Sequence, residues 1–235
     1  IKQELNEIYT IKDDIFNAAD YGVPQRRKRS IFRMIKKNSK FKIWNAPKKE
    51  EHISLKDAIG GLPTIDPLIR QEDKKINFPD FEKKKKKGIS VSKWHYPPTH
   101  SWHHVEWMQH TPSGKTAFEN TIYFPKVDSG RRINGRISTY KRFAWDKPAN
   151  TITQNNGVIS SAICVHPGRN LTSQTDERNR IFSDARVLTI YELMIVSSLP
   201  KDWDIPDWAN EKLIRSIIGE GIPPLLVKKI LQELA

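Results

Sequence analysis

Apolar and polar positions alternate in two stretches near the N-terminus. IYTIKDDIF at 8–16 and RSIFRMI at 29–35 follow the two-residue period of half-buried strands, and KQELNEIY at 2–9 has a short helical pattern. These elements predict the end of an α/β sheet whose earlier strands lie outside this sequence.

Three later stretches have helical spacing with clear boundaries. A brief helix is predicted at 54–59, capped by Ser54 and closed by Gly60-Gly61-Leu62-Pro63. RVLTIYELMIVSSLPKDW at 186–203 starts a helix with a Thr189–Glu192 capping box and ends it at Pro200. GEGIPPLLVKKILQELA at 219–235 begins with flexible glycines, and its two prolines open a helix with one apolar stripe.

The middle of the chain is less regular. KKINFPDFEKKKKKG at 74–88 is predicted to be a charged loop, either solvated or in non-specific contact with phosphates. Short apolar runs separated by Pro, Gly and Asn predict an irregular β-rich lobe over about 89–185. We therefore expect three parts: 1–65 with the end of the sheet and a connector, 66–205 with the lobe, and 206–235 with a helix that returns to the first part.

Candidate chemistry concentrates in NAADYGVPQRRKRSIFR at 17–33. On a strand, Gln25, Arg27 and Arg29 would share one face. An amide and two guanidinium groups with paired donors suit a phosphate, a carboxylate or a base edge, which favours a binding pocket over a merely basic surface strand.

This stretch resembles the Gly-Val-Pro-Gln-x-Arg-x-Arg motif of DNA cytosine-5 methyltransferases. The Arg-x-Leu-Thr-x-x-Glu segment at 186–192 is similar to a further motif of the family, and 219–224 resembles its last motif, Gly-Asn-x-Val-Pro-Pro, with Glu220 in place of Asn. TPSGKTAFEN at 111–120, YKRFAWDKPANTITQNNG at 140–157 and VHPGRNLTSQ at 165–174 resemble the family's target-recognition region. The resemblance implies an α/β fold: the C-terminal part of a Rossmann-like methyltransferase domain plus an irregular β-rich target-recognition domain.

Parts that such an enzyme needs are missing from the sequence. There is no Pro-Cys dipeptide for the nucleophile and no glycine-rich cofactor loop, and the one cysteine, Cys164, lies in an apolar run that predicts a buried strand. The sequence also starts at Ile1, as expected of a piece of a longer coding sequence. The resemblance thus implies a partner, a complementary catalytic subunit or N-terminal half, that carries the nucleophile and most of the S-adenosyl-L-methionine site. Alone, the chain is expected to be inactive.

Site residues follow from the resemblance. Gln25, Arg27 and Arg29 are expected at the flipped cytosine, and Gly219, Glu220, Gly221 and Ile222 at the cofactor. The expected DNA-binding residues are Lys115, Arg142, Lys147, Gln154, Asn155 and Asn156, with Arg131 or Arg132 on phosphates. Asn155-Asn156-Gly157 could equally be a tight turn.

Charge agrees with a polyanionic partner. The chain has 40 Lys and Arg against 27 Asp and Glu, a net charge of +13 and a pI of about 9.7. Such a chain should attract polyanions and lose affinity steeply with salt, which indicates a nucleic acid but not which kind. The resemblance implies that the partner is double-stranded DNA. No apolar run is long enough to span a bilayer and no signal peptide is evident, so we expect a cytoplasmic, nucleoid-associated protein.

Two other functions stay open at this point. A stand-alone DNA-binding module would have the same charge without catalysis. A metal-dependent nuclease is suggested by WHYPPTHSWHHVEWMQH at 94–110, where His100, His103 and His104 could converge on a helix, but no cysteine accompanies them. An HNH-type nuclease would also need a downstream metal-binding His and Asn at set spacings; Asn120 is present, but no His follows it until His166. Aromatic packing is the favoured interpretation, and no metal is predicted.

Overall fold

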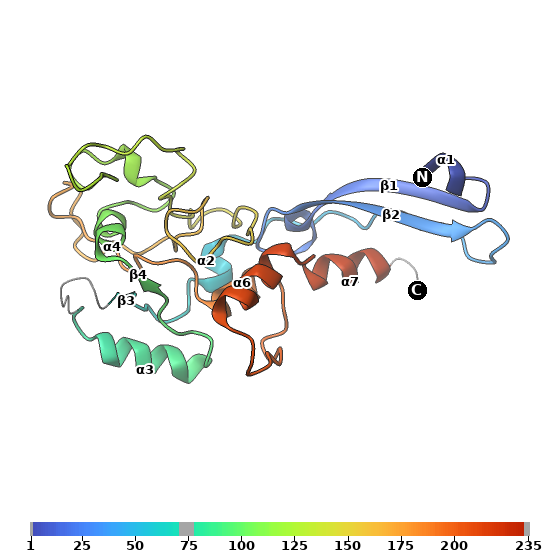
Figure 1. The fold of residues 1–235 in the computed structure, drawn as a ribbon. Helices are drawn as coiled ribbons and strands as arrows, with labels where there is room; N and C mark the ends of the chain where they lie inside the picture. The colour runs from blue at the N-terminus through green and yellow to red at the C-terminus, as the bar shows by residue number, and fades with distance from the viewer. Residues whose placement is uncertain (1, 71–77, 233–235) are drawn as a thin grey trace.

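Two long strands, β1 (Tyr9–Asn17) and β2 (Lys28–Lys36), form an antiparallel hairpin that extends from the rest of the molecule (Figure 1). This computed structural model describes residues 2–70 and 78–232. The predicted strands are confirmed, and the predicted N-terminal helix is reduced to α1 (Lys2–Leu5). The strands are joined through the 3₁₀ helix η1 (Ala18–Tyr21) and Gly22, whose φ of 79° is readily adopted only by glycine.

One face of the hairpin is covered by the C-terminal helix α7 (Pro224–Gln232) and its surroundings. Leu226 and Ile230 of α7 pack in one buried cluster with Phe16 and Val23, and the Trp44 indole N–H donates to Ile230 O at 2.7 Å. The predicted helix after the two prolines is thereby confirmed.

The opposite face of the hairpin is bare. Ile15, Phe32 and Met34 are 72%, 56% and 45% exposed, and Ile11 lies directly opposite Met34 on this face. An apolar sheet face of this kind is normally buried against another element.

The largest core lies where three helices meet. They are α2 (Leu55–Ile59), α5 (Ile190–Val196) and α6 (Glu211–Glu220). The capping boxes predicted for α5 and the Ser54 cap of α2 are both present. Helix α6 was not predicted, and it includes Gly219 and Glu220, so the glycine at 219 is helical and not a flexible lead-in.

The lobe contains more helix and less strand than its pattern predicts. The five lysines at 83–87 lie in helix α3 (Phe81–Val91), which corrects the prediction of a charged loop; residues 74–77 lie outside the described part. Lys84 reaches Asp66 at 2.6 Å, and Gly88 packs the helix against Ile65. These contacts fix a lysine-rich segment that would otherwise stay solvated.

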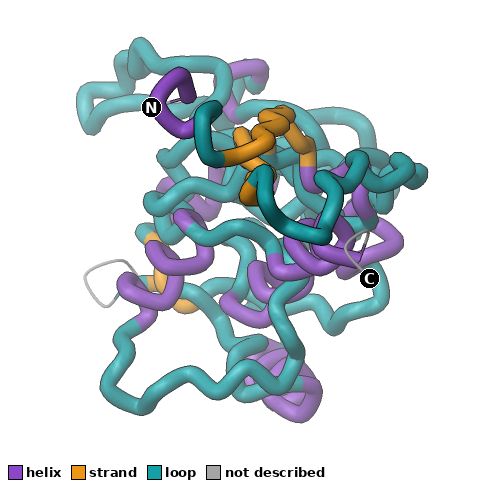
Figure 2. Tube along the Cα trace, turned by 90° about the vertical axis from the view of Figure 1, so that its right-hand side faces the viewer, coloured by secondary structure: helices purple, strands orange, loops and turns teal. Residues whose placement is uncertain are grey.

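The remaining elements of the lobe are short. They are β3 (Leu68–Ile69), β4 (Thr99–His100), α4 (Trp102–Gln109) and η2 (Ala117–Glu119). β3 and β4 pair in parallel, and among the described residues the other strand-like pairings are isolated bridges such as Arg142 with Val165. Loops dominate the tube in Figure 2. The mixed α/β character is confirmed. The lobe is more irregular than predicted, because side chains make the hydrogen bonds to backbone groups that neighbouring strands would make in a sheet.

Among the described helices, none is both long and apolar enough to cross a membrane.

Candidate functional site

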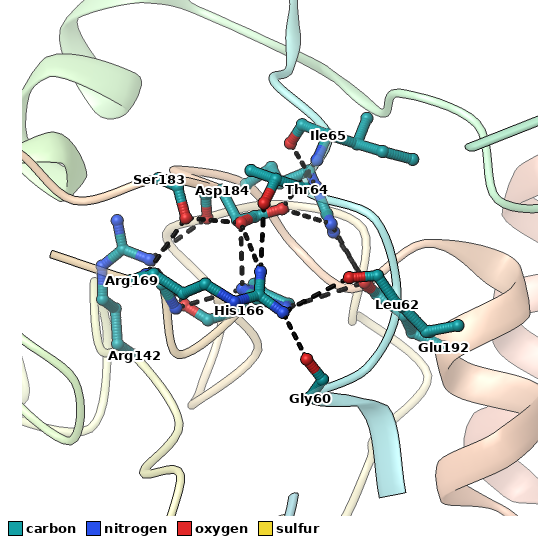
Figure 3. A network of polar contacts seen from close by, with 12 residues as sticks. Gly60, Leu62, Thr64, Ile65, Arg142, His166, Arg169, Ser183, Asp184 and Glu192 are labelled. Atoms are coloured by element: carbon teal, nitrogen blue, oxygen red, sulfur yellow. Dashed lines mark hydrogen bonds and ion pairs between the residues drawn. The ribbon is translucent and has the colours of Figure 1, made fainter. Parts of the chain in front are cut away.

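A buried polar network braces the lobe against helix α5 (Figure 3). Arg186, which has no exposed surface, donates to both oxygens of Glu192 at 2.8 and 3.0 Å and to Asp184 Oδ1 at 2.8 Å. His166 lies 3.8 Å from Asp184 and 3.7 Å from Glu192, and burial lowers its pKa to about 4. Burial would raise the pKa of Glu192, but Arg186 and His166 outweigh it and hold that pKa well below its usual value. Since its charges are matched internally, the network is a brace and not a ligand site.

Arg142 is a second buried guanidinium in the same region. It donates to Met108 O at 2.8 Å, His166 O at 2.7 Å and Asp184 O at 3.1 Å, and it has no exposed surface. The prediction that Arg142 reads DNA is therefore wrong for this fold. Arg142 instead stabilises the irregular loops, because their buried carbonyl oxygens need hydrogen-bond donors.

Arg27 ties together three distant segments of the chain. Its Nη1 donates to Ile152 O at 2.7 Å, and its Nη2 donates to Gly219 O at 2.7 Å and Glu220 O at 2.9 Å. Burial, followed by the charge of Arg29, lowers the pKa of Arg27 to about 10, so it stays cationic at neutral pH. Its Nε is buried without a hydrogen-bond partner in the described structure. The guanidinium thus serves as a clamp between the 151–155 loop and the C-terminal end of helix α6.

Gln25, two residues before Arg27, also connects segments that are distant in the sequence. Its amide nitrogen donates to Ser197 Oγ at 3.1 Å, and its amide oxygen accepts from Ile152 N at 3.3 Å. Gln25 and Arg27 precede strand β2 and line one cavity of about 90 Å³ together with Ile222 and Pro223. The shared face predicted for these two residues is confirmed, although they are extended chain before the strand.

Arg29 opens onto the surface next to this clamp. It lines an open groove of about 460 Å³ with Arg27, the loop at 151–155 and the last two residues of helix α6, Gly219 and Glu220. To the residues that the structure describes, its guanidinium makes one hydrogen bond, to Lys28 O at 2.8 Å, which leaves several donors available. The groove therefore offers fixed cationic donors to an anionic or hydrogen-bonding ligand.

Helix α6 approaches the 151–156 loop very closely. A Cβ atom on Gly219 would lie 2.3 Å from Thr153 O and 2.7 Å from Gln154 N. Glu220 is exposed, and its carboxylate accepts from the Gln154 amide and from Ser216 Oγ. The segments predicted for DNA and for cofactor are thus in direct contact.

The remaining predicted DNA-binding residues divide into exposed and buried ones. Gln154, Asn155 and Lys147 are exposed, and Lys115 is exposed with an ion pair to Glu119 at 3.0 Å. Asn156, however, is 2% exposed and bonds to Thr153 O at 2.7 Å and Arg215 O at 3.0 Å. The prediction that Asn156 contacts DNA is therefore wrong here, because its amide holds the loop to α6.

Arg215 is a site residue that the sequence reasoning missed. It is 4% exposed, donates to Asn156 Oδ1 at 3.1 Å and pairs with Glu211 at 2.8 Å. The Glu211–Arg215 spacing of four residues within the apolar pattern of 211–220 could have indicated this helix.

The histidines of 94–110 do not converge. His95 bonds to Thr189 Oγ1 at 3.0 Å, His100 accepts from Val187 N at 3.3 Å, and His110 stacks on Tyr123 with ring centroids 3.5 Å apart. His103 and His104 contact Trp107. Within the described ranges there is no group of three or more His, Cys, Asp or Glu that could hold a metal ion.

Cys164 is 3% exposed, and its thiol donates to Val158 O at 3.0 Å. Burial raises the pKa of this thiol to about 12, so it is not a thiolate at neutral pH. The predicted core role of Cys164 is confirmed.

Comparisons with known proteins agree with this architecture. The family model described as C-5 cytosine-specific DNA methylase matches residues 1–235. The chain is 45% identical over 234 residues to the Type II methyltransferase M1.HgaI of Avibacterium volantium and 27% identical over 225 residues to M1.HphI of Haemophilus parahaemolyticus. These matches cover 100% and 94% of this chain but only 58% and 47% of the relatives. The chain therefore spans about half the length of these relatives.

A solved structure from E. coli, described as a prophage-encoded DNA modification methyltransferase, has a similar fold. It aligns with 99% of this chain and 62% of its own length, with a TM-score of 0.59 and 21% sequence identity.

Proposed function

Because the chain belongs to the C-5 cytosine-specific DNA methylase family, we propose that it is the DNA-binding and target-recognition portion of a DNA cytosine-5 methyltransferase. The complete enzyme methylates C5 of a flipped cytosine in a specific duplex sequence with S-adenosyl-L-methionine. This portion is inactive without the N-terminal catalytic portion.

One observation carries this proposal: a single groove brings together Arg29, the 151–155 loop and Gly219–Glu220. The hydrogen bonds of Arg27 fix the 151–155 loop and Gly219–Glu220 in position relative to each other. An enzyme that flips a base must grip the surrounding duplex while one nucleotide leaves the stack, and a rigid shared support meets that need.

Within the groove we assign different roles to the three polar residues of the first motif. Arg29 contacts the target nucleotide or its phosphate, since its donors are available. Gln25 and Arg27 are positioning residues, because their hydrogen bonds are already made to the chain. Gln154 and Asn155 face the groove on an exposed loop and contact base edges, with Lys147 and Lys115 on phosphates.

The cofactor-binding proposal concerns Gly219, Glu220, Gly221 and Ile222. Ile222 is 46% exposed and Glu220 is also exposed, so this short segment presents both an apolar side chain and a hydrogen-bond acceptor. This combination fits one side of a nucleoside-type ligand and leaves the other side to the missing portion. S-adenosyl-L-methionine supplies the methyl group when bound, and this chain contributes a wall for it.

The bare hairpin face supports a complementary portion. Exposed Ile15, Phe32 and Met34 form an apolar sheet face that no described residue covers. The chain's one cysteine is buried as a thiol, so the nucleophile has to come from elsewhere.

The direct test is methyl transfer from labelled S-adenosyl-L-methionine to unmethylated duplex DNA. We expect activity when this chain is mixed with the upstream portion or neighbouring gene product, and none from either alone. Arg29→Ala should lower the activity of the mixture by about 10²-fold or more, as expected for loss of a charged contact to the reacting nucleotide. Arg178→Ala, at an exposed arginine of the lobe outside this groove, is the matched control. Activity from this chain alone would contradict the proposal, and salt-sensitive DNA binding without activity in the mixture would favour a stand-alone module.

A charge placed on the bare hairpin face should prevent complementation. Met34→Lys leaves the isolated chain folded because the side chain is 45% exposed, but in the complex it buries an unpaired ammonium. We expect at least a tenfold weaker association with the complementary portion in size-exclusion or pull-down titrations. Thr10→Lys, an exposed position on the opposite face, serves as control. Equal association of the two variants would place the partner elsewhere.

A further inference from the structure

Ile137 is unusually exposed for a large apolar side chain, at 74%. It follows Arg136 in a tight turn in which Thr139 N and Thr139 Oγ1 both donate to Arg136 O, at 2.9 and 2.8 Å. The side chain therefore stands at the tip of a hydrogen-bonded turn. A single exposed isoleucine is ordinary on a protein surface, so its support and surroundings decide what it can do.

The turn is anchored on three sides. Ser138 O accepts from Ile163 N at 2.8 Å, and Thr139 O accepts from Thr116 Oγ1 at 2.9 Å. Before the turn, Gly135 lies against the Phe118 ring, where a Cβ atom would come within 2.4 Å of the ring carbon Cζ. The tip is thus presented by a fixed support, so little conformational entropy is lost when it binds.

The stretch of sequence that contains the tip is basic. No acidic residue lies between Asp128 and Asp146, whereas this interval contains four arginines and one lysine. Arg132 is engaged with Phe118 O and Asn120 O at 2.9 and 3.0 Å. Arg131 and Arg136 are exposed and make no side-chain hydrogen bond or ion pair to a described residue. An exposed apolar side chain next to the available Arg136 guanidinium matches duplex DNA, which carries phosphates along both edges of a groove that contains apolar methyl groups.

The turn is hydrogen-bonded to the stretch of chain that follows the proposed reading loop. The hydrogen bond from Ile163 N joins it to the segment that continues from Gln154 and Asn155. In Figure 1, the yellow-green segment that contains the turn runs along the upper edge of the lobe.

We propose that Ile137 is a specificity-determining residue that contacts the 5-methyl group of a thymine in the major groove, while Arg131 and Arg136 hold the flanking phosphates. This inference rests on the proposed function and adds a base contact that the polar loop residues do not supply. The thymine methyl is the apolar group that the major groove presents, and isoleucine can distinguish it from cytosine or uracil.

The test uses the complemented protein, or the chain alone if it binds DNA. Duplexes are first selected from a randomised library by wild-type protein, and the binding of the fluorescein-labelled selected duplex and a shuffled duplex is then measured by anisotropy. Ile137→Ala should weaken binding to the selected duplex by about 5- to 10-fold, the size of one lost base contact, with less than twofold change on the shuffled duplex. Val91→Ala, 44% exposed at the end of helix α3 and outside the target-recognition segments, is the matched control and should change neither.

Replacement of thymines by uracil, one at a time, identifies the contacted methyl group. One such replacement should weaken wild-type binding and leave the affinity of Ile137→Ala unchanged. Arg136→Ala should instead weaken both duplexes equally and reduce the slope of log affinity against log salt by about 1. The inference is overturned if Ile137→Ala behaves like Val91→Ala. It is also overturned if every uracil replacement that weakens wild-type binding weakens binding by Ile137→Ala to the same extent. Failure of wild-type protein to bind any duplex would instead overturn the proposed function.

Discussion

Replacement of Arg186 by methionine is expected to lower the free energy of unfolding by about 3–5 kcal/mol, because it leaves two buried carboxylates without their cation. Asp184 and Glu192 both lie within 3.0 Å of this guanidinium, and neither side chain has more than 1% exposure. Arg186 also donates to Ile65 O at 2.8 Å, so the variant loses a link between the connector and α5 as well. Urea denaturation followed by circular dichroism measures the change.

The pH dependence of this loss has a definite sign. In the wild type, the pKa of Glu192 is lowered by Arg186, so its stabilisation is present above the unfolded pKa near 4.5 and declines as the pH falls. In the variant, burial raises the pKa of the same carboxyl, so acid stabilises that fold. The difference between the two proteins should therefore shrink between pH 7 and pH 5. Arg178→Met, at an exposed position in the same lobe, is the control and should change the free energy of unfolding by less than about 0.5 kcal/mol. A similarly small effect of Arg186→Met would contradict the stabilising role of the buried network.

Gly219→Ala is expected to destabilise the chain and disconnect the reading loop from helix α6. In an ordinary helix this change is favourable by about 1 kcal/mol. Here, the new Cβ would stand 2.3 Å from Thr153 O and 2.5 Å from Thr153 C, so backbone has to move. We expect a net loss of about 1–3 kcal/mol, typical of overpacking, and at least a tenfold loss of methyl transfer in the complemented enzyme.

The control for this variant is Gly61→Ala, because a Cβ at Gly61 would meet nothing within 4 Å. Its stability and activity should equal those of the wild type. If Gly219→Ala gains stability instead, the close approach of α6 to the loop does not constrain the groove. Denaturation and single-turnover methyl transfer, measured on the same preparations, separate the effect on folding from the effect on the site.

The difference between predicted and observed DNA-facing residues has a simple origin. Arg142 and Gln154 both follow turn-rich sequence with a favourable side chain, and local sequence does not distinguish them. In the fold, Arg142 has no exposed surface and Gln154 is exposed. Whether a polar side chain faces solvent depends on which carbonyl oxygens lie near it, and those come from residues 24 to 42 positions away for Arg142.

The sequence by itself determined the local elements and the chemistry of the first motif. The capping boxes at Ser54 and Thr189, the helix after Pro223-Pro224 and the strand alternation of the hairpin depend on near neighbours, so they could be read directly. The Gln25 and Arg27 spacing placed both side chains on one side for the same reason.

Only the tertiary structure decided what those side chains meet. Arg27 reaches Ile152, 125 positions away, and Gly219, 192 positions away, and this contact makes one groove from segments that seemed independent. The helix at 81–91 likewise depends on the packing of Gly88 against Ile65. Local sequence does not predict this helix, because repulsion between its consecutive lysines opposes helix formation. Local patterns are fixed by backbone geometry within a few residues, whereas a clamp of this kind exists only after hydrophobic burial has brought remote carbonyl oxygens around one guanidinium.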